Sequence, residues 1–134
     1  MAKNELKLLG AWFSPYALRV KIALNLKGVD YEVIEDTLFP KSELLLKSNP
    51  VLKKIPVLFH ADKAICESAI IVEYIDEVWS NAPSILPQNA YDRAQARFWV
   101  AYTWKGILFA FCLFIPRVHV LLKFLITSKV SLYF

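Results

Sequence analysis

The sequence is poor in the residues that mark several classes of protein. Only three of its 134 residues are Gly and only two are Cys, which excludes a low-complexity chain and a disulfide-rich scaffold. The two cysteines, Cys66 and Cys112, lie far apart and form neither a CxxC pair nor a metal-ligand cluster. We therefore predict no metal site, and we expect free thiols in a reducing compartment.

Acidic residues are missing from the end of the chain. All 12 of them precede Gly106, where they stand against 13 of the 16 Lys and Arg, so residues 1–105 are close to neutral. This balance excludes a strongly basic, nucleic-acid-binding surface on the main part of the protein. The first residues carry an acid and no long apolar run follows them, so we expect no secretory signal and a cytosolic protein.

The residues that are present suffice for one folded domain. Hydrophobic residues make up 57% of the chain and charged residues 21%, a balance typical of globular proteins. A short apolar run at residues 6–10 and the segment at 31–35 predict two strands. The helix between them begins at Ser14-Pro15, ends at Gly28, and has this expected core face: Leu18, Ile22, Ala23 and Leu26. Strand, helix and strand in this order predict a parallel pair with a right-handed crossover.

The following segments complete a small α/β pattern. Residues 41–47 predict a short helix, which Asn49-Pro50 ends. Residues 57–60 and 64–66 flank a turn and predict a β-hairpin. Ser68 is expected to cap one more helix, with three apolar residues at helical spacing: Ile71, Ile75 and Val78.

The rest of the chain has a different character. A Pro-rich linker at 82–87 precedes a helical region at 91–105. From Gly106 to Ile126 the chain is densely apolar, and we interpret it as a buried helix of an incomplete domain. The alternative, a membrane anchor, is disfavoured because a proline and polar residues interrupt the middle of the run: Pro116, Arg117, His119 and Lys123.

Four strings, in this order and spacing within residues 6–105, resemble tau-class glutathione transferases of plants: LKLLGAWFSPYALRVKIAL, SNPVLKKIPVL, ICESAIIVEYIDEVW and ILPQNAYDRAQARFWVAY. The resemblance implies an α/β protein with a thioredoxin-like N-terminal domain at 1–80. A linker at 81–90 and the start of an incomplete all-helical C-terminal domain at 91–134 would follow. The tail from about residue 106 does not resemble the family, so the chain is interpreted as a C-terminally truncated or aberrant member.

The resemblance also implies an activity. Members of the family conjugate the thiolate of glutathione, their co-substrate, to small hydrophobic electrophiles in detoxification and stress responses. The alternatives are a module that binds glutathione or hydrophobic ligands without turnover and an inactive truncated fragment. A homodimer like those of the family would be weakened by truncation, and we expect neither a nucleic-acid nor a membrane partner.

By resemblance, Ser14 is the catalytic residue. In the family, the hydroxyl at this position donates a hydrogen bond to the glutathione sulfur and so favours the thiolate, which is the reactive form. The positive end of the helix that starts here would act in the same direction. Without the resemblance, a Ser before Pro at a helix start is usually a cap and nothing more.

The resemblance assigns the carboxylate at the glycine end of glutathione to two lysines, Lys41 and Lys54. Lys53 stays an alternative to Lys54, and an isolated lysine is more often simply solvated. The Ile55–Pro56 bond would be cis and would aim the backbone N–H and C=O of Ile55 at the cysteinyl part of the ligand. Its alternative is an ordinary trans proline at a strand edge.

The γ-glutamyl end of glutathione carries an ammonium and a carboxylate. The resemblance assigns the ammonium to Glu67, and it assigns the carboxylate to Ser68 and the free N–H groups of its helix. The alternative, a simple helix cap beside an acid, is compatible with this role.

Other polar residues carry weaker signals. His60 and His119 have no partners at a meaningful spacing, and Cys66 is expected to be a small core residue. Three further residues could line the electrophile pocket, although packing between domains is favoured for them: Arg97, Trp99 and Tyr102.

Overall fold

The computed structural model describes residues 6–37 and 39–113. The chain divides after Ser84 into two compact units, and each is described by itself. Among these described residues, the first unit holds a sheet and three helices, and the second holds one long helix.

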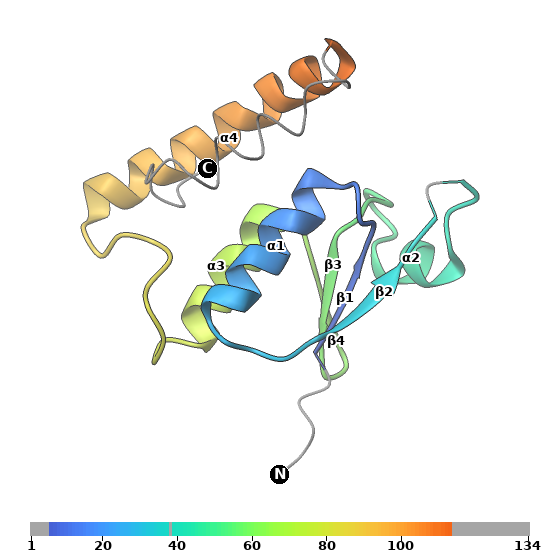
Figure 1. Cartoon of the computed structure of the whole chain (residues 1–134), viewed down its shortest axis with the longest axis horizontal. Coiled ribbons are helices and arrows are strands. Elements are labelled where there is room, and N and C mark those ends of the chain that lie inside the picture. The colour runs from blue at the N-terminus through green and yellow to red at the C-terminus, as the bar shows by residue number, and fades with distance from the viewer. Residues whose placement is uncertain (1–5, 38, 114–134) are drawn as a thin grey trace. The chain divides into compact units, whose positions relative to one another are not determined.

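The first unit is built on a four-stranded sheet of order β2-β1-β3-β4 (Figure 1). Its strands are β1 (Leu6–Gly10), β2 (Glu32–Glu35), β3 (Val57–His60) and β4 (Lys63–Cys66). β1 runs parallel to β2 and antiparallel to β3, and β3 and β4 form an antiparallel hairpin. The predicted parallel pair and the predicted hairpin are therefore confirmed, and the element order is that of the thioredoxin-like fold.

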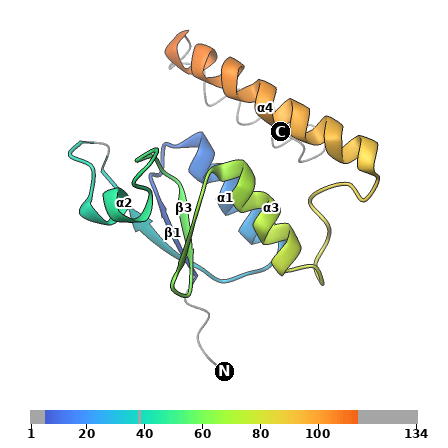
Figure 2. The ribbon, with the colours of Figure 1, turned by 180° about the vertical axis from the view of Figure 1, so that it is seen from behind.

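Helices cover both faces of this sheet. Figures 1 and 2 show α1 (Pro15–Leu26) and α3 (Ser68–Val78) lying side by side on one face. On the other face, Leu45 of the short helix α2 (Glu43–Ser48) packs against Leu9 and Val57. Neighbouring strand residues point to opposite faces, so the sheet contributes a buried layer to each side and forms the centre of the core.

The predicted core face of α1 is right at one position and wrong at another. Ala23 is buried as predicted, but Leu26 is 42% exposed, and three buried residues of the helix were not predicted: Ala17, Val20 and Leu24. The reason is a close approach of the helix to β1, because a Cβ atom on Gly10 would lie 3.0 Å from the Cβ of Ala17. Small residues at this crossing, and not the largest aliphatic ones, select the face that meets the sheet.

A buried ion pair joins the end of α1 to α3. Lys27 follows α1, and its Nζ lies 2.7 Å from Oδ1 of Asp76 and donates to the carbonyl of Pro83 at 2.9 Å. The lysine side chain is fully buried. Gly28, which has a φ of 63°, then reverses the chain in the left-handed conformation that the sequence predicts for it.

Two helix starts differ from prediction. α2 begins at Glu43 and not at Lys41, because the Oγ of Ser42 accepts a hydrogen bond from the Leu45 N–H at 3.1 Å and caps the helix. Ser68 is the first residue of α3 and not its cap; the cap position belongs to Glu67, which makes no side-chain capping bond. Both shifts matter because they set where the predicted ligand-binding residues lie.

The second unit contains α4 (Ala90–Leu113), which begins where a helical region is predicted. The Oδ1 of Asn89 accepts hydrogen bonds from the N–H groups of Tyr91 and Asp92 at 2.8 and 3.3 Å and caps it. The helix continues through Gly106, where the composition changes, and residues 114–134 of the apolar tail lie outside the described residues. Within the described ranges, no helix has the length and apolar character needed to cross a membrane.

Candidate functional site

The strand register brings the predicted site segments to one end of the sheet. Leu9 pairs with Val57 and Val57 pairs with Cys66, so β1 ends where β3 begins and where β4 ends. The loops that leave or enter the sheet at this end carry three of the predicted groups: Ser14, Ile55–Pro56 and Glu67–Ser68. Residues separated by more than 50 positions in the sequence therefore share one end of the sheet.

Ser14 occupies the N-cap of α1, with Pro15 as the first helical residue. Its Oγ accepts a hydrogen bond from the Ala17 N–H at 3.3 Å, and the residue is buried. Because this bond uses a lone pair of the oxygen, the hydroxyl proton is left to donate to another group. The capping role and the predicted role toward a sulfur are thus compatible in one side chain.

The Ile55–Pro56 peptide bond is cis, as predicted. The loop before it is held by Asn49, which sequence reasoning treated only as a helix stop. The buried Asn49 side chain accepts from the Leu52 N–H at 3.2 Å and donates to the Lys54 carbonyl at 2.9 Å. This amide therefore fixes the path of the chain into Ile55 and β3.

Both predicted carboxylate-binding lysines are exposed. Lys41 precedes the cap of α2, and Lys54 lies in the loop that Asn49 holds. Neither lysine forms an ion pair with a residue in the described part of the chain. Their ammonium groups are available to an anion in solution, and the choice between Lys53 and Lys54 stays open.

Glu67 has a backbone conformation that an L-residue adopts rarely, with φ at 71° and ψ at 116°. Such values cost on the order of 1–3 kcal/mol and tend to persist where function requires them. Directly after it, the buried Oγ of Ser68 accepts a hydrogen bond from Nη1 of Arg19 at 3.2 Å. The strained residue thus stands directly before the first turn of α3, whose leading N–H groups have no intrahelical acceptor.

Arg19 is the residue of this site that sequence reasoning missed. It bridges α1 and α3 through Ser68, and burial lowers the pKa of its guanidinium while coupling to Tyr16 opposes that shift. Burial also raises the pKa of Tyr16, Arg19 lowers it, and Glu67 adds a smaller upward effect. Tyr16 and Arg19 lie about one helical turn apart, and this spacing in the sequence could have indicated that their side chains interact.

Cys66 is a structural residue, in agreement with the prediction. It packs against the cluster of Leu9, Leu45 and Val57, and its Sγ lies 3.6 Å from the carbonyl oxygen of Ser48. Burial, followed by the charge of Glu67, raises the pKa of the thiol. The thiol is therefore held in its protonated, unreactive form.

The described histidine also has structural contacts. Nδ1 of His60 lies 2.7 Å from the hydroxyl of Tyr74, and its ring stacks on Trp79 with centroids 5.4 Å apart. His60 ends β3 and so lies at the opposite end of that strand from Val57, while His119 lies outside the described residues. No cluster of three or more metal-binding side chains occurs within residues 6–37 and 39–113.

The predicted electrophile-binding residues lie on α4. Trp99 and Tyr102 contact each other and Phe98 through their rings, with centroid separations of 5.3 to 6.2 Å. Arg97 lies on the same helix. The electrophile role of these residues stays a prediction.

Comparisons with known proteins agree on one family. The profile described as "Glutathione S-transferase, N-terminal domain" matches residues 4–77. Arabidopsis thaliana glutathione S-transferase U17 is 65% identical over 103 residues, a region that covers 76% of this chain and 45% of that protein. The chain therefore spans about half the length of the curated relatives that it matches.

Solved structures agree with the sequences. A tau-class glutathione S-transferase from mango is 63% identical with a TM-score of 0.75, and the match covers 81% of this chain and 50% of that one. A rice glutathione S-transferase, solved in complex with glutathione, is 43% identical with a TM-score of 0.74 over 78% of this chain and 49% of that one.

Proposed function

The chain belongs to the glutathione S-transferase family as a homologue of its tau class, and from this premise we propose that it binds glutathione and transfers its thiolate to hydrophobic electrophiles. The proposal rests on one observation, which is that three predicted groups lie at the same end of the sheet: Ser14, Ile55–Pro56 and Glu67–Ser68. A structure at 43% identity was solved with glutathione, which supports glutathione as the ligand.

Ser14 activates the thiol in this proposal. Its hydroxyl proton is free to point at the glutathione sulfur, because the Ala17 N–H already occupies a lone pair of the oxygen. A hydrogen bond to sulfur stabilises the thiolate over the thiol, and the N-terminus of α1 adds partial positive charge. Each unit by which the thiol pKa falls corresponds to about 1.4 kcal/mol.

The remaining residues hold the tripeptide along its length. The Ile55 backbone would pair with the cysteinyl part like an added strand. Lys41 and Lys54 suit the glycine carboxylate, since both are exposed and without a described ion pair. Glu67 suits the γ-glutamyl ammonium, while Ser68 and the leading N–H groups of α3 suit the γ-glutamyl carboxylate.

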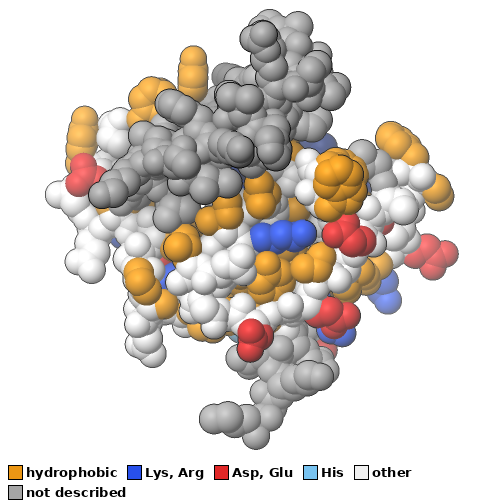
Figure 3. All heavy atoms as spheres, in the orientation of Figure 1, with side chains coloured by type: hydrophobic (Ala, Val, Ile, Leu, Met, Phe, Trp, Pro, Cys, Tyr) orange, Lys and Arg blue, Asp and Glu red, His pale blue; other side chains and the backbone are white. Residues whose placement is uncertain are grey.

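An apolar surface beside Ser14 fits a hydrophobic second substrate. Trp12 is 80% exposed and Phe13 is 41% exposed, and their rings meet edge to face at 5.6 Å. Figure 3 shows hydrophobic side chains exposed among charged ones on the described part of one molecular face. Large exposed aromatic residues favour interaction with apolar ligands.

A second candidate function is glutathione binding without turnover. It is favoured by one observation, namely that every predicted glutathione contact lies in the first unit. Transfer needs the electrophile to be positioned as well. A chain that binds glutathione but conjugates it to none of a broad panel of electrophiles would have this function and not the first.

The test is thermal unfolding of the full chain with and without glutathione, with S-methylglutathione as a ligand that cannot form a thiolate. Ligand at 100 times its dissociation constant stabilises the folded state by about 2.7 kcal/mol. Ser14→Ala should remove the ultraviolet absorbance of bound thiolate and retain binding of S-methylglutathione. Ser42→Ala, which removes the same kind of cap from α2, is the matched control and should retain both. Absence of a glutathione-dependent shift in the unsubstituted chain would refute the proposal.

A further inference from the structure

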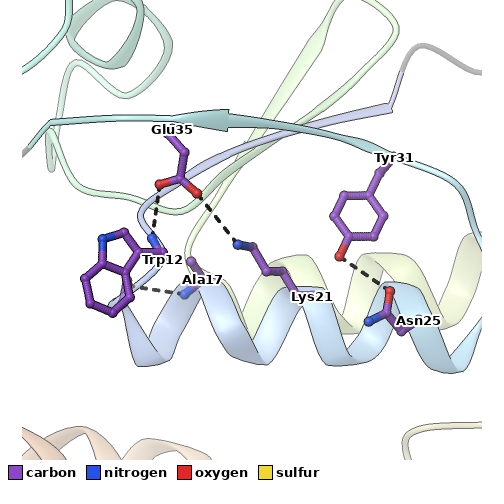
Figure 4. A network of polar contacts seen from close by, with 7 residues as sticks. Trp12, Ala17, Lys21, Asn25, Tyr31 and Glu35 are labelled. Atoms are coloured by element: carbon purple, nitrogen blue, oxygen red, sulfur yellow. Dashed lines mark hydrogen bonds and ion pairs between the residues drawn. The ribbon is translucent and has the colours of Figure 1, made fainter.

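The Glu35 carboxylate makes two contacts that the proposed chemistry has not used. Glu35 ends β2, where it pairs in register with Gly10 at the end of β1. Its Oε2 accepts a hydrogen bond from the Trp12 N–H at 3.1 Å, and its Oε1 lies 4.0 Å from Nζ of Lys21 on α1. Figure 4 shows this carboxylate between the loop and the helix, with one oxygen toward each.

The loop held in this way is the one that presents Ser14. Residues 11–13 connect β1 to the N-cap of α1, and a bond from the Ser14 N–H to the Ala11 carbonyl closes the turn at 3.0 Å. The Trp12 side chain is 80% exposed, so it contributes little packing that would anchor the turn. Glu35 connects the middle of this loop to the sheet.

We propose that Glu35 is a positioning residue for Ser14: its carboxylate fixes the Trp12 amide and thereby sets where the Ser14 hydroxyl meets the glutathione sulfur. The inference rests on the proposed function, in which Ser14 stabilises the thiolate. Glu35 acts through the loop and does not touch the reacting sulfur. Lys21 faces the carboxylate from the α1 side, with its Nζ 4.0 Å from Oε1, the oxygen that does not bind Trp12.

Glu32 provides a matched control on the same strand. It forms an ion pair with Lys7 at 3.6 Å, and its side chain is 64% exposed against 53% for Glu35. Glu32 pairs in register with Lys7, away from the loop that presents Ser14. A general effect of removing a carboxylate from β2 should therefore appear in both variants, whereas a positioning effect should appear only at Glu35.

The experiment compares Glu35→Ala, Glu35→Gln and Glu32→Gln in the full chain. The first readout is the pH titration of bound glutathione, followed by the ultraviolet absorbance of the thiolate. Small displacements of a catalytic group have large effects on chemistry, and the loss of an ordinary hydrogen bond, which an exposed bond such as this one resembles, costs a factor of roughly three to ten. Glu35→Ala should therefore lower the thiolate fraction by about that factor at a pH below the midpoint, with S-methylglutathione affinity unchanged. Glu35→Gln keeps an oxygen acceptor and should recover much of the loss, while Glu32→Gln should match the unsubstituted chain.

Hydrogen exchange of the Trp12 amide in the ligand-free protein gives the second readout. Glu35→Ala should speed this exchange severalfold, and Glu32→Gln should not. Unchanged exchange overturns the inference, and so does faster exchange with an unchanged thiolate titration, which would leave Glu35 a structural role only. If the unsubstituted chain shows no bound thiolate, the proposed function fails and the inference fails with it. If instead the unsubstituted chain forms the thiolate and the Glu35 variants titrate as it does, the proposed function stands and only the inference about Glu35 fails.

Discussion

Replacement of Asp76 by Ala should destabilise the first unit strongly. Asp76 is the carboxylate partner of Lys27, whose Nζ is fully buried at 2.7 Å from Oδ1. The substitution leaves that ammonium inside the protein, where it still donates to the Pro83 carbonyl at 2.9 Å. A carbonyl dipole does not replace a carboxylate charge, so the folded state has to accommodate a poorly compensated cation.

The size of the effect follows from this burial. Removing one partner of a buried ion pair costs about 3–5 kcal/mol, because the remaining charge loses its compensation. Small domains have total stabilities of about 5–15 kcal/mol, so this change removes a large part of the stability. Removing both charges, as in Lys27→Met with Asp76→Ala, should cost less than the sum of the two single changes, because no uncompensated charge is left.

Urea unfolding of the full chain, followed by far-ultraviolet circular dichroism, measures these free energies. Glu77→Ala is the control: it removes a carboxylate from the neighbouring position of α3, and Glu77 is exposed. The control should stay within about 0.5 kcal/mol of the unsubstituted chain. If Asp76→Ala lowers the free energy of unfolding by less than about 1 kcal/mol, the reasoning from burial is refuted. A double variant that loses the full sum would refute the coupling.

Three further changes test other features. Burial, and secondarily Glu67, raises the pKa of the Cys66 thiol, so alkylation of Cys66 at neutral pH, measured by mass spectrometry of its peptide, should be slow. Glu67→Gln should accelerate this alkylation, and equal rates in the variant and the unsubstituted chain would contradict the reasoning. Gly28 has a φ of 63°, and a Cβ at this position would meet no neighbouring atom within 4 Å, so only backbone strain should oppose a side chain here. Gly28→Ala should therefore cost about 1 kcal/mol in urea unfolding and Gly28→Asn clearly less. An Ala variant as stable as the Asn variant would count against strain. Glu67→Gly should relieve the backbone strain and so be more stable against urea than Glu67→Ala, and equal stability of the two variants would show that the strain is absent. Calorimetry should show that both variants bind glutathione more weakly than the unsubstituted chain.

Local patterns in the sequence were enough to predict the order of elements in the first unit. Ser14-Pro15 predicts a helix start because both residues act within one turn of themselves. Gly28 predicts the end of that helix for the same reason, since its left-handed conformation is a local property. The parallel pairing of β1 and β2 followed from the helix between them, because a helical crossover joins parallel strands, whereas antiparallel neighbours can be joined by a short turn.

The contacts that build the site could not be read in this way, because each joins polar groups far apart in the chain. Glu35 reaches Trp12 across 23 positions, and Arg19 reaches Ser68 across 49. A helical periodicity offers no reason to bury a lysine, yet Lys27 is buried beside Asp76, 49 positions further along the chain. A buried polar residue is stable only beside a specific partner, and periodicity along one segment carries no information about that partner. The same contacts connect the Ser14 loop to β2 and α1 to α3, so the features least visible in the sequence are the ones that support the predicted site residues from behind.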